Sequence, residues 1–184
     1  MIETNLYEYL ERISNLIQSE KHYVSSTIDL TPVQILTLNY LSRCNRFSDT
    51  SSALALLLDE SVNQLGQSID SLAENDFLNK ATDRDNPEEV RLVLTAKGQQ
   101  AVSEIVVLLR DSTFSVFDKV GTDGTEEYLA DLLIQLQVAN KNKSFGQCQT
   151  CTHFIKESDH SFKCGLTQGV LGSDDIVKIC QEHA

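Results

Sequence analysis

Four of the five cysteines in this 184-residue chain lie after residue 147. They follow the pattern Cys148-x2-Cys151-x12-Cys164-x15-Cys180. A Cys-x2-Cys turn lets two thiolates reach one metal from a single tight loop, and two further thiolates complete a tetrahedral set. The pattern therefore restricts the last part of the chain to a small module in which these four thiols lie close together.

A disulfide framework, the other common use of four cysteines, requires an oxidising compartment. The segment from Met1 to Asn5 lacks the positively charged start of a signal peptide, and no apolar run approaches the ~18 residues of a membrane span. We therefore expect a cytoplasmic protein with reduced thiols and no membrane contact. Reduced cysteines without a metal fit the tail poorly, because so small a module with few large apolar residues usually needs a metal to hold its shape.

The pattern leaves the identity of the metal centre open. Zinc ribbons typically have two Cys-x2-Cys knuckles, whereas this tail has one. One knuckle followed by two widely spaced cysteines is similar to the arrangement in high-potential iron–sulfur proteins. We therefore expect an iron–sulfur cluster of the 4Fe-4S type, with Zn2+ as the alternative. Three histidines could replace one ligand, although four cysteines need none: His153, His160 and His183.

Upstream of the tail, apolar spacing and capping motifs predict helices. In the first helix, which extends to about residue 27, apolar residues recur at i, i+4, i+7 and i+11. These residues are Leu6, Leu10, Ile13 and Ile17. A second helix begins at the capping box Thr31–Gln34, where Pro32 suits the first helical position, and it stops near Cys44.

The elements that follow predict a winged helix. A short helix covers about residues 50–58, and a second capping box, Ser61–Gln64, opens a helix that ends at Asn75. A β-hairpin follows, with strands at residues 77–82 and 90–95, and the apolar residues of the second strand alternate. Helix, short helix, helix and hairpin in this order make a winged helix-turn-helix.

Two more helices follow the hairpin, one from Thr95 and one from about Thr125. The first and last helices carry more apolar surface than a compact winged helix can cover alone, so we predict an obligate homodimer. That surface comprises Leu6, Leu10, Ile13, Ile17, Leu129, Leu132 and Leu136. The expected fold class is mainly α with a small β-hairpin wing in residues 1–140, followed by a cysteine-rich, metal-bound tail in residues 141–184.

This order of elements resembles the MarR family of transcription regulators over about residues 2–139. The resemblance rests on Leu30-Thr31-Pro32-Val33-Gln34, Ser61-Val62-Asn63-Gln64-Leu65, Leu72-Ala73-Glu74-Asn75-Asp76-Phe77 and Leu94-Thr95-Ala96-Lys97-Gly98. It implies a homodimer built by the terminal helices, with the fourth helix in the major groove of double-stranded DNA and the wing at the minor groove. The residues expected to contact DNA are Ser61, Asn63, Gln64, Gln67, Ser68, Arg84 and Arg91.

The charge distribution limits this DNA-binding hypothesis. The net charge is −12, and no Lys or Arg occurs between Ser61 and Asn75, although Lys and Arg contacts to phosphates supply essentially all non-specific DNA affinity. The family's wing usually carries an Asp-Arg-Arg-like run, which Asn86-Pro87-Glu88-Glu89 replaces here. Asn and Gln can read adenine, each good pair contributing ~1–3 kcal/mol of discrimination, but they neutralise no phosphate. We therefore expect DNA binding that is weak or confined to a narrow set of sites.

Two functions follow from these features. The first is a transcription regulator whose DNA affinity responds to redox state, oxygen or iron through the tail. The second is a winged-helix interaction protein that docks a partner protein, with a zinc ion that only stabilises the tail. Enzymatic activity is not expected, because no nucleophile–base constellation, phosphate loop or paired-carboxylate motif occurs outside the tail. Cys44, the fifth cysteine, is expected to be a small core residue.

Overall fold

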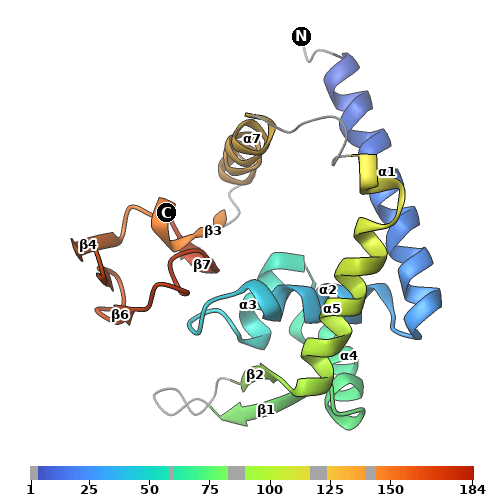
Figure 1. Cartoon of the computed structure of the whole chain (residues 1–184), viewed down its shortest axis with the longest axis horizontal. Helices are drawn as coiled ribbons and strands as arrows, with labels where there is room; N and C mark the ends of the chain where they lie inside the picture. Colours follow the sequence, from blue (N-terminus) through green and yellow to red (C-terminus); the bar gives the residue numbers. More distant parts are fainter. Residues whose placement is uncertain (1–3, 59, 83–89, 117–123, 140–143) are drawn as a thin grey trace.

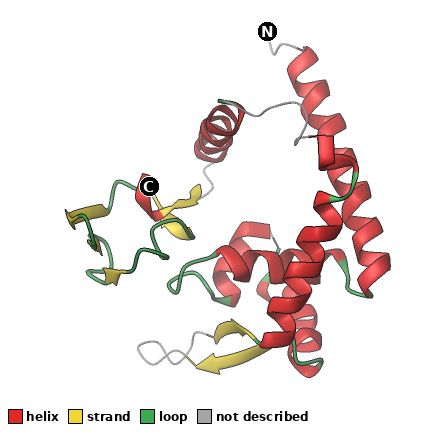
Figure 2. Cartoon of the chain, viewed as in Figure 1, coloured by secondary structure: helices red, strands yellow, loops and turns green. Residues whose placement is uncertain are grey.

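The computed structural model describes residues 4–58, 60–82, 90–116, 124–139 and 144–184 (Figure 1). Its helices are α1 (Thr4–Ile28), α2 (Pro32–Arg43), α3 (Ser51–Leu58), α4 (Val62–Glu74), α5 (Ala96–Arg110) and α7 (Thr125–Ala139), with short 3-10 helices η1 (Thr113–Val116) and η2 (Cys148–Thr150). Its strands are β1 (Leu78–Thr82), β2 (Val90–Leu94), β3 (Ser144–Gln147), β4 (Phe154–Ser158), β5 (Ser161–Cys164), β6 (Val170–Leu171) and β7 (Ile179–His183). Figure 2 shows helices around one hairpin and a separate tail of short strands and loops, so the mainly α winged helix predicted from the sequence is confirmed.

Two helices start at the capping boxes that the sequence contains. Before α2, the Gln34 N–H donates to Thr31 Oγ1 (3.2 Å) and the Thr31 N–H donates to Gln34 Oε1 (2.8 Å). Ser61 and Gln64 form the same reciprocal pair before α4. Each box satisfies two N–H groups at a helix start that would otherwise lack partners.

The main core lies where α2, α3, α4 and α5 meet the hairpin. Strand β1 pairs antiparallel with β2, from Leu78 opposite Leu94 to Thr82 opposite Val90. The largest fully buried apolar side chains are Val24, Leu38, Leu54, Leu65, Leu72, Leu78, Leu92 and Ile105. Helix α5 approaches the hairpin closely, because a Cβ at Gly98 would run into the carbonyl oxygen of Phe77. Glycine at position 98 permits this approach.

Helices α1 and α7 leave apolar side chains exposed in a single copy of the chain. Helix α7 has no buried residue, and its Leu129, Leu133 and Leu136 are 49%, 53% and 46% exposed. On α1, Leu6, Ile13 and Leu16 are exposed to a similar degree. None of the helices in the described ranges is long and apolar enough to cross a membrane.

The tail folds into two small antiparallel sheets. Strand β3 pairs with β7, and the other sheet has the order β4-β5-β6. The small core of the tail contains buried and partly buried side chains, namely Cys148, Phe154, Phe162, Cys164, Leu171, Ile176 and Cys180. Phe47, from the loop between α2 and α3 (residues 44–50, hereafter the α2–α3 loop), packs on the same cluster. The tail therefore has its own core and lies against this loop (Figure 1).

Candidate functional site

The four cysteines predicted as ligands lie around the small core of the tail. Cys148 and Cys180 are buried, with 7% and 8% of their surface exposed. Cys164 packs against the same cluster. Cys151 is half-buried and closes the turn that Cys148 begins, since its N–H donates to the Cys148 carbonyl oxygen (3.1 Å).

Strand pairing carries the two distant cysteines back to the Cys-x2-Cys turn. Strand β3 leads into this turn and β4 leaves it. Gly146 of β3 pairs with Cys180 of β7, and Phe154 of β4 pairs with Cys164 of β5. Cys164 and Cys180 are thus placed by the two sheets, one on each side of the turn.

The thiols of Cys148 and Cys180 shift each other's pKa. Hydrogen bonding with Cys148 lowers the pKa of Cys180. The same interaction, together with burial, raises the pKa of Cys148. The pair therefore favours a thiolate at Cys180, and the thiolate is the form of cysteine that binds metals.

Aromatic rings and N–H donors surround the sulfurs. Phe154 and Phe162 stack beside the buried cysteines, with ring centroids 5.6 Å apart. Asn45 Nδ2 donates to Cys148 Sγ (3.2 Å), and the His153 N–H donates to Cys151 Sγ (3.5 Å). An apolar shell and hydrogen bonds to sulfur are features that tune thiolate-bound metals.

The four thiols do not converge on a single point. Within the described ranges, no three His, Cys, Asp or Glu side chains are grouped closely enough to hold a single metal ion. Of the three histidines considered as substitute ligands, His183 contacts the Cys-x2-Cys turn, with its Nε2 2.9 Å from Thr150 Oγ1. Soft thiols are the donor type that zinc and iron–sulfur clusters take, but the four described cysteines are not brought together as a closed site.

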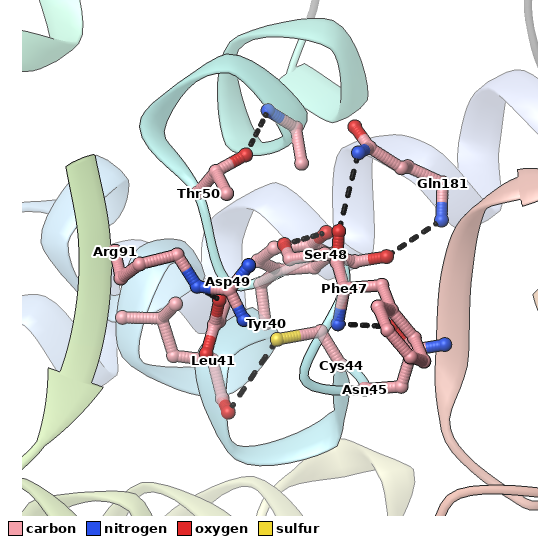
Figure 3. A network of polar contacts seen from close by, with 11 residues as sticks. Tyr40, Leu41, Cys44, Asn45, Phe47, Ser48, Asp49, Thr50, Arg91 and Gln181 are labelled. Atoms are coloured by element: carbon pink, nitrogen blue, oxygen red, sulfur yellow. Dashed lines mark hydrogen bonds and ion pairs between the residues drawn. The ribbon is translucent and has the colours of Figure 1, made fainter. Parts of the chain in front are cut away.

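The α2–α3 loop joins the tail by several hydrogen bonds. The Asn45 N–H donates to the Ile179 carbonyl oxygen (2.9 Å). The Gln181 N–H donates to Ser48 Oγ (2.9 Å), and Gln181 Nε2 donates to the Phe47 carbonyl oxygen (3.3 Å). Figure 3 shows Gln181 reaching the loop from one side and Arg91 of β2 from the other.

The other end of the α2–α3 loop is joined to the wing. Arg91 Nε lies 2.6 Å from Asp49 Oδ1, and both side chains are mostly buried. The Leu92 N–H donates to the Asp49 carbonyl oxygen (2.7 Å), and Thr50 forms a β-bridge with Arg91. Arg91, which the resemblance assigned to DNA contact, therefore pairs with an aspartate in this structure (Figure 3).

The remaining residues predicted to contact DNA lie along α4. Asn63 and Gln67 are exposed, Ser68 is half-buried, and Ser61 and Gln64 hold the capping box of the helix. Asp70 of the same helix pairs with Lys80 of β1. Arg84 and the stretch Asn86–Glu89 lie outside the described residues. Apart from Val62, the exposed face of α4 is therefore polar, and among the described residues its Asp70 is paired with Lys80.

Sequence reasoning did not identify Asn45, Ser48 or Asp49 as functional candidates. Their segment was expected to be a connection between two helices, and its polar side chains are ordinary for a loop. All three make contacts with segments far away in the chain. Cys44, in contrast, is buried as expected, and burial, followed by the charge of Asp49, raises its pKa to about 12.

Comparison with known proteins places the fold. No protein-family model matches this sequence, and no curated protein is significantly similar to it. Among solved structures, S. aureus MepR in its DNA-binding conformation has a TM-score of 0.62 at 19% identity, over 72% of this chain and 98% of MepR. A MarR transcriptional regulator from Methanosarcina mazei Go1 has a TM-score of 0.58 at 18% identity, over 73% of this chain and 98% of that one. The chain has the MarR-type winged-helix fold.

A third solved structure extends the range of this likeness. CouR from Rhodococcus jostii RHA1, solved with p-coumaroyl-CoA, has a TM-score of 0.60 at 12% identity, over 76% of this chain and 94% of CouR. These regulators are matched over nearly their whole length, whereas about a quarter of this chain has no counterpart in them. That share is about the size of the cysteine tail.

Proposed function

We propose that this protein is a homodimeric, DNA-binding transcription regulator of MarR type whose DNA affinity is modulated through its cysteine tail. The observation that carries the proposal is the fold, which matches solved MarR-type regulators over almost their entire length. One of the similar structures is a complex of S. aureus MepR with DNA, with a TM-score of 0.57 at 19% identity. The proposal assigns the chain no catalytic activity.

Dimer formation is supported by the apolar surface of α1 and α7. No leucine of α7 is buried within one copy of the chain, and apolar residues of α1 are exposed to a similar degree. Exposed apolar surface of this extent marks an interaction site. A second copy, joined through the terminal helices, would cover it.

Sequence-specific reading of DNA is assigned to Asn63 and Gln67. Both side chains are exposed on α4, and both amides can pair with adenine. Helix α4 has no Lys or Arg, and the neighbouring Lys80 is paired with Asp70. Affinity should therefore depend strongly on base sequence and little on phosphate contacts.

The test is selection of a preferred site from a random double-stranded DNA library, followed by binding of variants. Asn63→Ala and Gln67→Ala should each weaken binding to the selected site by about 5- to 150-fold, since a good bidentate pair contributes ~1–3 kcal/mol. Binding to random DNA should barely change. Gln100→Ala, an exposed glutamine on α5, is the matched control and should bind as the unaltered protein does.

The metal centre belongs to the same proposal. Cys148, Cys151, Cys164 and Cys180 would hold an iron–sulfur cluster, with Zn2+ as the alternative. A cluster would supply redox and oxygen sensitivity, and zinc would supply structural stability. Metal analysis and the absorption spectrum of anaerobically purified protein distinguish the cluster from zinc, because a brown protein that absorbs at about 400 nm contains a cluster.

The modulating role of the tail is tested by DNA binding of three forms of the protein. These forms are the metal-loaded protein, the metal-free protein and a truncation at Asn140. If all three bind the selected site equally well, the cysteine site only stabilises the tail. A coupling free energy requires contacts that differ between the loaded and metal-free states.

A second candidate function is an interaction protein that docks a partner protein, with structural zinc in the tail. The acidic balance of the chain, with a net charge of −12, and the polar face of α4 favour this alternative. Failure of the library selection to enrich any DNA sequence, together with zinc in the purified protein, would support it.

A further inference from the structure

Helix α4 carries a carboxylate on the same face as the two amides assigned to base reading. Asn63, Gln67 and Asp70 follow one another at intervals of four and three residues, which places them on one face of the helix. All three residues are exposed, and the opposite face of the helix is buried. The buried residues are Leu65, Ile69 and Leu72. A ligand that lies against Asn63 and Gln67 therefore also meets Asp70.

Asp70 is paired with a cation of the wing. The hairpin lies beside α4 (Figure 1), and Lys80 Nζ of β1 donates to Asp70 Oδ1. Both side chains remain accessible, with 58% of Asp70 and 38% of Lys80 exposed. The ion pair restrains the carboxylate through Oδ1, so Oδ2 can accept from a further donor at the surface.

A carboxylate in the major groove favours one base. Cytosine presents its N4 amino group there as a donor, and Asp and Glu are the side chains that accept from it. Guanine N7 and O6 and thymine O4 are acceptors, and an ionised carboxylate can only accept. Adenine N6 is a donor, but the N7 acceptor beside it repels a second acceptor. Asp70 is therefore suited to cytosine, whereas Asn63 and Gln67 are suited to adenine.

The carboxylate also acts on DNA of any sequence. Phosphates repel a negative side chain, and α4 has no Lys or Arg that would offset this repulsion. Lys80 offsets the charge of Asp70 at close range, which lets the carboxylate approach the groove. Replacing Asp70 with a neutral residue should therefore raise binding to random DNA while it removes a base preference.

The spacing along α4 locates the cytosine relative to the adenines. Asp70 lies three residues beyond Gln67, which is about 4.5 Å along the helix axis. Successive base pairs are about 3.4 Å apart. The cytosine is therefore expected about one or two base pairs from the adenine that Gln67 reads. In a homodimer it should recur in both half-sites.

We propose that Asp70 is a specificity-determining residue of the DNA interface, which selects a cytosine next to the adenines read by Asn63 and Gln67, and that Lys80 positions its carboxylate. The inference rests on the proposed function in one respect, the entry of α4 into the major groove. It is independent of the tail and of any metal centre. It predicts a recognition site that contains C·G pairs at fixed positions beside A·T pairs.

The test repeats the selection from the random double-stranded library with Asp70→Asn. The variant keeps the size of the side chain but carries an amide, which reads adenine. One position in each half-site should therefore change from cytosine to adenine. The unaltered protein should bind its own site about 5- to 150-fold more tightly than the same site with thymine in place of that cytosine. For Asp70→Asn this ratio should fall below about twofold.

Two further variants separate base reading from charge. Glu74→Gln is the matched control, because Glu74 lies four residues after Asp70 on the same exposed face and the change removes the same charge. It should leave every base preference unchanged. Lys80→Met should weaken binding to the selected site in the unaltered protein and have little further effect in Asp70→Asn. Equal losses in both backgrounds would mean that Lys80 contacts phosphate and does not position Asp70.

The outcomes separate this inference from the function on which it rests. If the unaltered protein enriches no sequence, the DNA-binding proposal is wrong and the inference fails with it. If it enriches a site and Asp70→Asn enriches the same one, the role of Asp70 is wrong and the regulator proposal stands. A loss of the cytosine preference in Glu74→Gln would likewise overturn the assignment to Asp70, because a general charge effect would then explain it.

Discussion

Replacing three leucines of α7 with alanine should abolish the dimer without unfolding the single chain. The variant is Leu129→Ala, Leu133→Ala and Leu136→Ala in one protein. No residue of α7 is buried within one copy, and these leucines are 49%, 53% and 46% exposed. Stability of the separate chain therefore has little dependence on them, whereas the interface of the proposed dimer depends on them twice, once in each copy.

The magnitude follows from the exposed half of each side chain. A leucine-to-alanine change removes three carbons, each contributing ~0.8 kcal/mol on full burial, so covering the exposed half is worth ~1.2 kcal/mol per leucine. Three leucines in each of two copies give at most roughly 7 kcal/mol. Because 1.4 kcal/mol is a factor of ten, the dimer Kd should rise by up to about 10⁵-fold.

The assay is sedimentation equilibrium across nanomolar to micromolar concentrations, with circular dichroism to check the helix content. Leu166→Ala is the matched control, since Leu166 lies in the tail and is also 49% exposed. It should leave the dimer Kd unchanged. An unaltered protein that is monomeric at micromolar concentration, or a triple variant with the same Kd, would refute the assignment of α7 to the interface.

Three further predictions concern single residues. Serine in place of any one proposed ligand (Cys148, Cys151, Cys164 or Cys180) should lower the metal content and loosen the chain after about residue 145. Cys44→Ser should leave the metal content unchanged. Metal analysis and limited proteolysis check both expectations. Burial raises the pKa of Cys44 from 9.0 to about 12, so its contribution to folding stability is full below about pH 9 and is lost as the pH rises through 12. Over this range, the free energy of unfolding of Cys44→Ala should depend less on pH than that of the unaltered protein. Gly98→Ala should destabilise the winged helix by ~1–3 kcal/mol, because the new Cβ meets the Phe77 carbonyl oxygen. Its matched control in α4, Gly66→Ala, meets nothing within 4 Å and should stabilise by ~0.5–1 kcal/mol in chemical denaturation.

The winged helix could be predicted from the sequence because its signals are local. The capping boxes at Thr31 and Ser61 need a donor and an acceptor only three residues apart, and both formed where expected. In β2 the alternating apolar pattern marks the one fully buried residue of the strand, Leu92, although Val90 on the same face is exposed and Leu94 is half-buried. Such signals depend on chain periodicity, which is independent of how distant segments pack.

The strands of the tail were not predicted, although its cysteines were recognised. Strand β6 has two residues, and β4 exposes most of its side chains. Segments so short and so polar carry no clear periodicity. Their pairing depends on cross-strand neighbours and on the small shared core, which a linear pattern does not specify.

The sequence by itself determined the helices, the hairpin and the clustering of four cysteines in one tail. Only the tertiary structure decided where that tail lies. The contact between Asn45 and Cys148 joins residues 103 positions apart, and Arg91, a DNA contact by resemblance, pairs with Asp49 of the same loop. Neither pairing has a sequence signal, because each depends on the packing of two elements brought together by the hydrophobic cores on either side of the loop.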